Sequence, residues 1–324
     1  MSRELFNLTQ KQSLPLEGKI ILTQERIRQW YDHFDGQVYV SFSGGKDSTV
    51  LKHLVENTPG VYDVPSLFVN TGLEYTELQK FAMSQPNVTT IRPKMRFDQV
   101  IKRFGYPAIG KEVANAVYGA KRGAPWAIRK LNGLNKDGEP DPFRKQYKKY
   151  KHLVDSPFLI GDGCCRVMKK NPAALYSKET GRKPFIGTLA CESALRKTEW
   201  LKNGCNAFHA KKQVSTPMAF WTEQDVLQYI VENNLEYASV YGEIKKDENG
   251  KYYTTGADRT GCMFCMFGCH LEKSPNRFQR MKETHPRQYE YCIGGGEMVD
   301  GVWQPNKQGL GLGKVLDDLG VKYE

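Results

Sequence analysis

The sequence predicts an α/β protein with an open, mostly parallel twisted sheet and helices on both of its faces. Short β-rich runs alternate with helical patterns over residues 38–91, at the spacing typical of βαβ units. A glycine-rich turn joins the first β-rich run directly to a helical pattern, as in sheets that bind ligands at the carboxyl ends of their strands. The chain has 324 residues, 40% of them hydrophobic, so it is long enough to bury such a core.

The first expected element is an amphipathic helix over 23–34, which brings Ile27, Trp30 and Phe34 to one face. The expected strands are short and rich in β-branched or aromatic residues, and they cover 38–42, 66–70, 88–91 and 183–189. The expected helices between and after them have apolar residues at helical spacing, and they cover 47–55, 74–84 and 222–233.

Two segments depart from this alternation. Residues 105–160 contain glycine, proline and many basic residues, and we expect an insertion of helices and loops there. From about residue 238 the chain becomes rich in turns and cysteine, and it closes on a short helix over 315–319. We therefore predict an N-terminal helical arm (1–35), a central α/β domain (36–237) and a C-terminal cysteine-rich module (238–324).

The composition favours a soluble, cytoplasmic protein. No apolar run approaches the roughly 18 to 20 residues that a membrane-spanning helix needs. The first residues, MSRELFNLTQKQ, lack the apolar core of a secretory signal, so we expect neither secretion nor a membrane partner. Eight cysteines in such a protein indicate metal or sulfur chemistry rather than a disulfide framework.

Positive charge is concentrated in one segment of the chain. The whole chain has 47 Lys and Arg against 36 Asp and Glu, a net charge of +11. Residues 92–151 hold 16 basic against 5 acidic residues, so this segment alone accounts for the excess. Aromatic residues are interleaved with the charges: Tyr118, Trp126, Tyr147 and Tyr150. The segment suits the phosphates and bases of tRNA or DNA, and the alternative is a solvated face that only aids solubility.

The turn SGGKDS at residues 43–48 lies directly after a predicted strand and directly before a predicted helix. Glycines let backbone N–H groups approach a polyphosphate closely, and the helix directs its positive end at the anion. Lys46 adds a positive charge, while Ser43 and Ser48 add hydroxyl donors. A turn that needs glycine only for its geometry would not explain these side chains, so we predict that residues 36–237 bind a nucleotide.

This turn resembles the PP-loop of the N-type ATP pyrophosphatase superfamily. The segment NTGLE, which begins at Asn70, is similar to the second strand of the phosphoadenosine-phosphosulfate (PAPS) reductase branch, with Asn70 in place of the usual aspartate. Two later segments resemble the same branch: GTLACESALRKTEWL, with Glu192, Ser193 and Arg196, and PMAFWTEQDVLQYI, with Trp221 and Asp225. The resemblance spans roughly residues 38–270.

The resemblance implies the fold of the adenine nucleotide α-hydrolases, with a nucleotide across the carboxyl ends of the strands. It implies that ATP, with Mg²⁺, is bound by Ser43, Gly44, Gly45, Lys46, Asp47, Ser48, Asn70, Thr71 and Gly72. Lys46 and Asp47 are also candidate catalytic residues. Arg196 is a third, because its planar guanidinium matches a phosphate or sulfate; the alternative is an i, i+4 partner of Glu192 on an exposed helix.

Five cysteines form two groups in the sequence. Cys164 and Cys165 are adjacent, and Cys262, Cys265 and Cys269 lie within eight residues as CMFCMFGC. Thiolates bind soft metals, and a C-x-x-C pair supplies two ligands from one turn. Adjacent cysteines are poor ligands for tetrahedral Zn²⁺ but can bind different irons of one cluster, so we favour an iron–sulfur cluster over zinc.

The adjacent pair and the later C-x-x-C resemble the motif of iron–sulfur adenylylsulfate reductases. That resemblance implies a [4Fe–4S] cluster held by Cys164, Cys165, Cys262 and Cys265. Cys269 is then a free, candidate catalytic thiol that handles sulfur. In the alternative ligand set, Cys262, Cys265 and Cys269 bind three irons, and one member of the adjacent pair binds the fourth. Cys191 is either a reactive thiol or a small buried residue.

Three functions are compatible with these motifs. We favour an ATP-dependent sulfurtransferase that adenylates its substrate and releases pyrophosphate, with the cluster carrying or delivering sulfide. Its acceptor would be tRNA or DNA, as in the DNA phosphorothioation enzymes of this branch. An adenylylsulfate or PAPS reductase is the first alternative, although the chain ends without the cysteine-containing tail of those enzymes. A non-enzymatic nucleotide- or nucleic-acid-binding module with structural zinc is the second. The sulfur donor does not follow from these residues.

Overall fold

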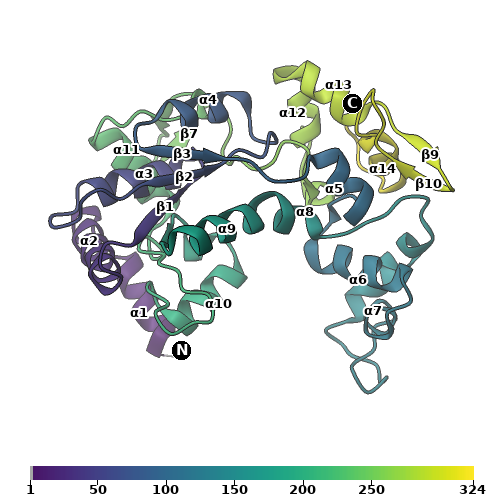
Figure 1. Cartoon of the computed structure of the whole chain (residues 1–324), viewed down its shortest axis with the longest axis horizontal. Coiled ribbons are helices and arrows are strands. Elements are labelled where there is room, and N and C mark those ends of the chain that lie inside the picture. Colours follow the sequence, from purple (N-terminus) through teal and green to yellow (C-terminus); the bar gives the residue numbers. More distant parts are fainter. Residues whose placement is uncertain (1–2) are drawn as a thin grey trace. The chain divides into compact units, whose positions relative to one another are not determined.

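The structure is a computed structural model that describes residues 3–324, and the chain folds into two compact units (Figure 1). Unit 1 comprises Met1–Arg92 and Pro172–Thr260, and unit 2 comprises Pro93–Asn171 and Gly261–Glu324. Each unit is therefore assembled from two separate stretches of chain. The three domains predicted from the sequence (1–35, 36–237 and 238–324) divide the chain differently from these two units, and they stay a prediction.

A four-stranded parallel sheet forms the centre of unit 1 and confirms the predicted fold class. Its strand order is β3-β2-β1-β5, with β3 at Val88–Ile91, β2 at Ser66–Val69, β1 at Val38–Phe42 and β5 at Lys183–Ile186. From β1 the chain first moves outward to β2 and β3, and it later returns to the other side of β1 as β5. The switch point of the sheet, where open α/β sheets bind ligands, is therefore at the carboxyl ends of β1 and β5.

Helices cover both faces of this sheet, as the sequence predicts. Val38 and Val40 point into the main core, which also contains Ile27 and Trp30 of one helix. Tyr39 points to the opposite face, where it packs on the ring of Tyr176. The α-helices of unit 1 are α1 Arg3–Gln12, α2 Leu16–His33, α3 Lys46–Glu56, α4 Thr76–Ser84, α9 Asn171–Thr180, α10 Ala194–Asn203 and α11 Glu223–Glu232.

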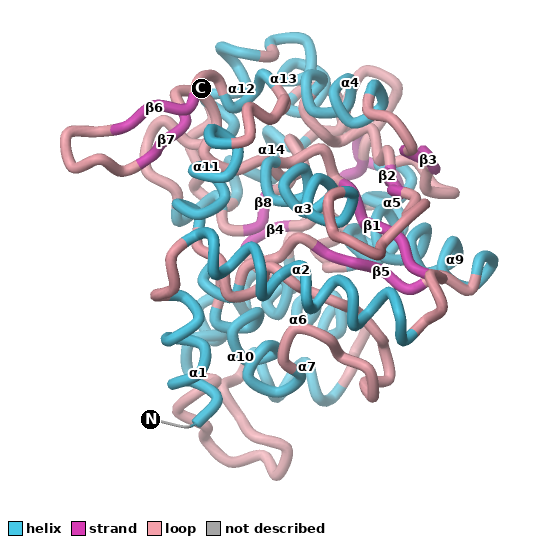
Figure 2. Tube along the Cα trace, turned by 90° about the vertical axis from the view of Figure 1, so that its left-hand side faces the viewer, coloured by secondary structure: helices cyan, strands magenta, loops and turns pink. Residues whose placement is uncertain are grey.

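The C-terminal part of unit 1 is the loop-like region expected near residue 250. The strands β6 (Ile244–Lys246) and β7 (Tyr252–Thr254) form an antiparallel hairpin there. The hairpin packs beside α11, where the Gln224 side chain exchanges two hydrogen bonds of 2.8 Å with the backbone of Tyr252 (Figure 2). Two short 3₁₀ turns, η3 (Ala190–Glu192) and η4 (Ser239–Tyr241), complete the unit.

Unit 2 joins the whole predicted insertion (105–160) to residues 261–324 of the predicted cysteine-rich module. The short strands β4 (Ala108–Ile109) and β8 (Met266–Phe267) pair in parallel and connect the two stretches of chain. An antiparallel hairpin of β9 (Glu297–Val299) and β10 (Val302–Gln304) lies in the same unit. Its helices are α5 Phe97–Phe104, α6 Lys111–Lys121, α7 Pro125–Leu131, η1 Lys145–Asp155, α8 Gly163–Cys165, the π-helical turn η2 Arg166–Lys170, η5 Cys269–Leu271, α12 Arg277–Thr284, α13 Pro286–Ile293 and α14 Leu312–Asp318. Across residues 3–324, no helix is long and apolar enough to cross a membrane.

Candidate functional site

The glycine-rich loop follows β1 at the switch point of the sheet. Gly44 has a φ of +75°, and a Cβ there would lie 2.9 Å from the Ala82 Cβ and 3.0 Å from the Leu78 carbonyl oxygen. Gly187 follows β5, and a Cβ there would lie 2.9 Å from the carbonyl oxygen of Asp47. Only glycine lets α4 and the end of β5 come this close to the loop.

We expect Gly44→Ala to be more destabilising than a glycine substitution at an open position with a similar backbone angle. Gly60 is the matched control, because its φ is +83° and nothing lies within 4 Å of its Cβ position. Both variants place alanine in the left-handed region, at a cost of about 1 to 2 kcal/mol, and only Gly44→Ala adds a clash. Urea unfolding measures both; equal losses of unfolding free energy would contradict the close packing of the loop.

The two serines of the loop hold its shape. Ser43 Oγ accepts a hydrogen bond from the Gly45 N–H at 3.3 Å, and the hydroxyl oxygens of Ser43 and Ser48 are 3.0 Å apart. Ser48 Oγ donates to the Gly45 carbonyl at 2.9 Å. Gly45 occupies the N-cap of α3, so no side chain caps this helix. The first turn of an 11-residue helix therefore directs backbone N–H groups and its positive end toward the loop.

Lys46 is held in place by groups from later parts of unit 1. Its Nζ lies 2.5 Å from Oε1 of Glu223 and donates to the Asp258 carbonyl oxygen at 2.6 Å. The same Nζ lies 5.6 Å from the ring centre of Tyr241, whose hydroxyl accepts from the Lys46 backbone N–H at 3.3 Å. The lysine side chain is only 7% exposed, whereas Glu223 is 54% exposed. The ammonium group is thus fixed at the loop by a partner that itself faces solvent.

Two arginines add positive charge around Asp47. Burial raises the pKa of the Asp47 carboxyl, as does Glu223, whereas Lys46, Arg259 and Arg196 act in the opposite direction. Arg196 and Arg259 both form ion pairs with the single carboxylate of Glu192. Burial lowers the pKa of Arg196, and the nearby Arg259 lowers it further. The two guanidiniums thus lie near both Glu192 and Asp47, and their planar N–H groups match a phosphate or sulfate.

The Asn70-Thr71-Gly72 turn follows β2 and is closed by its own polar groups. Asn70 Oδ1 accepts from the Gly72 N–H at 3.1 Å and from Nε2 of Gln79 at 2.6 Å. The Thr71 hydroxyl donates to Oε1 of Glu74 at 2.7 Å, and the Thr71 N–H donates to Oε2 at 3.1 Å. These bonds fix the turn at the carboxyl end of β2, and direct contact of the three residues with a nucleotide stays a prediction.

Four charged or hydroxyl-bearing groups at the loop were not among the sequence-predicted site residues: Glu223, Tyr241, Asp258 and Arg259. The sequence did contain a signal for the position of Glu223. Thr222 caps α11, and Oδ2 of Asp225 accepts from the Thr222 N–H at 2.6 Å in a capping box. The same oxygen pairs with the buried Lys19 at 2.7 Å. The W-T-x-x-D motif therefore fixes the start of α11, which sets Glu223 against Lys46.

The exposed thiol of Cys191 also lies near this loop. Burial of its sulfur raises the pKa of Cys191, and the negative charges of Asp47, Glu223 and Asp225 raise it further. Its Sγ donates to the Trp221 carbonyl oxygen at 3.6 Å. These surroundings disfavour the thiolate form, so this cysteine is not activated as a nucleophile in the ligand-free state.

The two cysteine groups of the sequence come together inside unit 2. Burial raises the pKa of Cys164 well above its usual range, and the nearby Cys262, Cys165 and Cys265 raise it further. Burial also raises the pKa of Cys265, and it raises that of Cys269 to about 11. None of these cysteines forms a disulfide bond within residues 3–324. Neighbouring buried thiolates repel one another, and a bound metal cation or cluster would offset that repulsion.

The chemistry of this donor set fits an iron–sulfur cluster or a soft metal. Within residues 3–324, however, no three His, Cys, Asp or Glu side chains are arranged closely enough to hold one ion. One polar atom beside the thiols has no assigned role: Nδ1 of His270 is buried and has no hydrogen-bond partner in the described part of the chain. His270 directly follows Cys269 in the sequence, and Cys269 is the thiol that the first predicted ligand set does not use.

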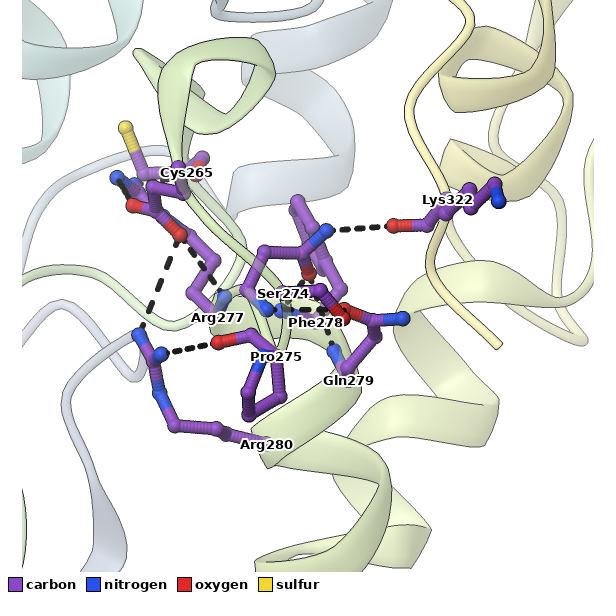
Figure 3. Close-up of polar contacts among 10 residues, drawn as sticks. Cys265, Ser274, Pro275, Arg277, Phe278, Gln279, Arg280 and Lys322 are labelled. Carbon is purple, nitrogen blue, oxygen red and sulfur yellow. Dashed lines mark hydrogen bonds and ion pairs between the residues drawn. The ribbon is translucent and has the colours of Figure 1, made fainter.

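The C-x-x-C turn is fixed by an arginine at the start of α12 (Figure 3). Arg277 Nη1 donates to the Cys265 carbonyl oxygen at 2.7 Å, and its Nε donates to Oε1 of Glu272 at 2.8 Å. Asn276 caps α12, because its Oδ1 accepts from the Phe278 N–H at 3.0 Å. The helix start thus holds the guanidinium against the backbone of a predicted ligand.

Comparison with known proteins identifies similar chains. The family described as phosphoadenosine phosphosulfate reductase domain matches residues 37–106 and 128–268. An uncharacterized protein of Methanocaldococcus jannaschii is 25% identical over 289 residues, which are 86% of this chain and 48% of that protein. The chain thus spans about half the length of this relative. The crystal structure of a PAPS reductase from Candida auris in a phosphate complex aligns with 74% of this chain and 98% of its own, at 15% identity and a TM-score of 0.37.

Proposed function

Because the chain belongs to the phosphoadenosine phosphosulfate reductase domain family, we propose that it is a nucleotide-dependent enzyme of sulfur chemistry, an ATP-dependent sulfurtransferase. The observation that carries the proposal is the loop at residues 43–48. There α3 begins after Gly45, the ammonium of Lys46 is fixed by Glu223, and the guanidiniums of Arg196 and Arg259 lie near Asp47. These groups suit a polyphosphate, and the SGGKDS form of the loop favours ATP.

The proposed reaction has two steps. An oxygen of the acceptor forms a bond to the α-phosphorus of ATP, the bond from that phosphorus to the β-bridging oxygen breaks, and pyrophosphate leaves with the electron pair. The N–H groups of α3 and the ammonium of Lys46 stabilise the charge that develops on the leaving pyrophosphate, to which Mg²⁺ would add further positive charge. A sulfide-level donor then forms a bond to the acceptor carbon or phosphorus that bears the adenylated oxygen. The bond from that atom to the oxygen breaks, and AMP leaves with the oxygen and the electron pair.

The thiols of unit 2 would supply the sulfur-handling part of this enzyme. Cys164, Cys165, Cys262 and Cys265 would hold a [4Fe–4S] cluster, which would bind or deliver sulfide. Three features support this set: Cys164 lies near the charges of the other three thiols, Cys164 is buried while the others are half-buried, and the Cys265 turn is fixed by Arg277. Cys269, with the unpaired Nδ1 of His270 next to it in the chain, is the candidate sulfur-handling thiol.

An adenylylsulfate or PAPS reductase is the second candidate function. It is favoured by the same neighbouring thiols, because paired and C-x-x-C cysteines match the iron–sulfur reductases of the family. Its substrate would place a sulfate-type group where Arg196 and Arg259 share Glu192. The nucleotide would then be a substrate that carries sulfur rather than an activating reagent.

Incubation of anaerobically purified protein with labelled nucleotides separates the functions. Release of pyrophosphate from ATP, dependent on an acceptor, supports the sulfurtransferase. Release of sulfite from adenylylsulfate or PAPS in the presence of a thiol reductant supports the reductase instead. Tight nucleotide binding without either product would leave a non-enzymatic binding module and would overturn both.

The acceptor that we propose is a nucleic acid, tRNA or DNA, bound by the basic segment 92–151. In the structure some of its charges are used locally, for example in the ion pairs Lys130–Glu112 and Arg144–Asp141. Others face solvent together with large aromatic side chains, since Trp126 is 46% exposed and Phe143 is 85% exposed. Free charge beside exposed rings suits a flexible polyanion whose bases stack.

Affinity for tRNA or DNA is therefore expected to fall steeply with salt. Each neutralised phosphate contributes a slope of roughly −0.7 to −0.9 in log K against log salt. Replacing four exposed lysines of the segment with alanine should flatten this slope and weaken binding: Lys145, Lys148, Lys149 and Lys151. A gel-shift series across ionic strength measures the effect.

The control for this series removes the same charge from unit 1. Four exposed lysines there are suitable: Lys178, Lys202, Lys211 and Lys212. This variant should keep the wild-type slope if binding is local to the basic segment. If both quadruple variants bind nucleic acid equally weakly, only the net charge of the protein matters. If the wild-type protein causes no gel shift of tRNA or DNA even at low salt, nucleic acid is not the acceptor.

A further inference from the structure

Unit 2 contains a cavity of about 340 Å³ that shares no residue with the loop site. One wall is a face of α6, because Lys111, Asn115 and Tyr118 are spaced i, i+4 and i+7. Residues of the segment 162–170 and Phe104 also line the cavity. From that segment the cavity is lined by Asp162, Gly163, Cys165, Arg166 and Lys170.

The cavity has an excess of positive charge. Lys111, Arg166 and Lys170 contribute three cations, and none of them forms an ion pair with an acidic side chain in the part of the chain that the structure describes. The single acid, Asp162, accepts a hydrogen bond from Nδ2 of Asn115 at 3.2 Å. Unpaired cations that converge on one cavity favour an anionic ligand.

The walls are held in a defined geometry. A Cβ on Gly163 would lie 2.7 Å from the Phe104 Cβ, so only glycine lets the chain pass this close to the aromatic ring. The Arg166 guanidinium lies 5.4 Å from the centre of the same ring, a cation–π distance that helps to fix its position. The π-helical turn η2 carries both Arg166 and Lys170, and such turns are frequent at functional sites.

We propose that this cavity is a binding site for a small molecule that carries a phosphate- or sulfate-type group. A volume of about 340 Å³ falls within the usual range for small-molecule sites, and it is much larger than a single water or ion requires. Because Cys165 lines the same cavity, the bound molecule lies next to the group of four thiols. The site gives unit 2 its own ligand, separate from the nucleotide proposed at the loop.

The shared chemistry of the ligand is an oxyanion of phosphorus or sulfur, which has two sources. A nucleotide would present a phosphate ester, whereas a sulfur compound would present sulfite or sulfate. Calorimetric titration of the full-length protein with inorganic phosphate, sulfite and 5′-AMP distinguishes them. The titrations use the Lys46→Ala background, so that the loop of unit 1 contributes as little as possible and a failure of the loop assignment does not affect the result.

The test compares four variants in that background. Arg166→Ala and Lys170→Ala should each weaken binding of the preferred probe about tenfold or more, as loss of a charged hydrogen bond does. Lys307→Ala removes one exposed charge from unit 2 outside the cavity and should leave the affinity unchanged. Asn115→Trp keeps every charge but fills the cavity, so it should abolish binding.

Tighter binding of 5′-AMP than of phosphate would support an organic phosphate as the ligand, and preference for sulfite would support a sulfur oxyanion. Three results would overturn the site: no probe binds, Arg166→Ala and Lys307→Ala behave alike, or Asn115→Trp retains full affinity. In the last case the anion would be bound by diffuse surface charge. Circular dichroism of each variant confirms that the fold is retained before affinities are compared.

Discussion

Lys46→Ala is expected to lower acceptor-dependent pyrophosphate release by about 10²- to 10³-fold, the effect of losing one group that stabilises charge in a transition state. The side chain is 7% exposed and its ammonium is fixed at the loop by Glu223 and the Asp258 carbonyl oxygen. Nucleotide affinity should also fall, because the charge is lost from the ground-state complex as well.

Lys52→Ala is the matched control for this variant. Lys52 lies on the same helix, its side chain is 6% exposed, and it also pairs with one glutamate, Glu56. Both substitutions should therefore cost similar stability, measured by urea unfolding. Only Lys46→Ala should impair catalysis; unchanged nucleotide affinity in Lys46→Ala, or equal loss of activity in both variants, would refute the assignment of the loop.

Cys262→Ser and Cys265→Ser are each expected to remove the bound cluster and, with it, all sulfur transfer. Anaerobically purified wild-type protein should be brown and contain iron and sulfide, as expected for iron bound by cysteine thiolates. Each variant should be colourless or nearly so, because a hydroxyl is a poor ligand for these irons. Visible spectra with iron, sulfide and zinc analysis measure the outcome.

The controls use cysteines away from the group of four thiols. Cys205 and Cys292 are buried, and replacing either with serine tests whether loss of any buried thiol has the same effect. Cys269→Ser distinguishes the two ligand sets, since a retained cluster with lost activity would make Cys269 the sulfur-handling thiol. Colourless wild-type protein with one equivalent of zinc would instead establish a structural metal site.

Regular elements with a clear pattern could be predicted from the sequence. The strands at 38–42 and 88–91 have the predicted bounds, because short β-rich runs ended by turn residues leave little choice. The helix expected over 23–34 begins earlier, at Leu16, because Pro15 adopts the extended conformation at its N-cap and allows the helix to start there. The helical segments α8 and η2 were not expected, since Gly163-Cys164-Cys165 has low helix propensity and forms through tertiary packing.

The candidate site also contains some residues that form a sequence pattern and others that do not. Ser43 to Ser48 could be predicted because the loop is one contiguous motif, and a strand and a helix in fact flank it. Tyr241 and Arg259 could not, because they reach the loop from irregular segments whose path depends on packing rather than on a local pattern. Glu223 was readable in principle from the capping box of α11. The charged cavity beside Cys165 could not be predicted from the sequence, because the residues that line it do not belong to one linear motif.

The interrupted order of the two units has a consequence for biosynthesis. Cys164 and Cys165 are in the first stretch of unit 2, and Cys262 and Cys265 are in the second, with all of Pro172–Thr260 between them. At a translation rate of about 5–20 residues per second, the ribosome needs roughly 5 to 20 s to reach the second pair. During that interval the first pair cannot yet meet its partners. Any cluster bound by all four thiols must therefore be inserted after the second half of unit 2 has been synthesised.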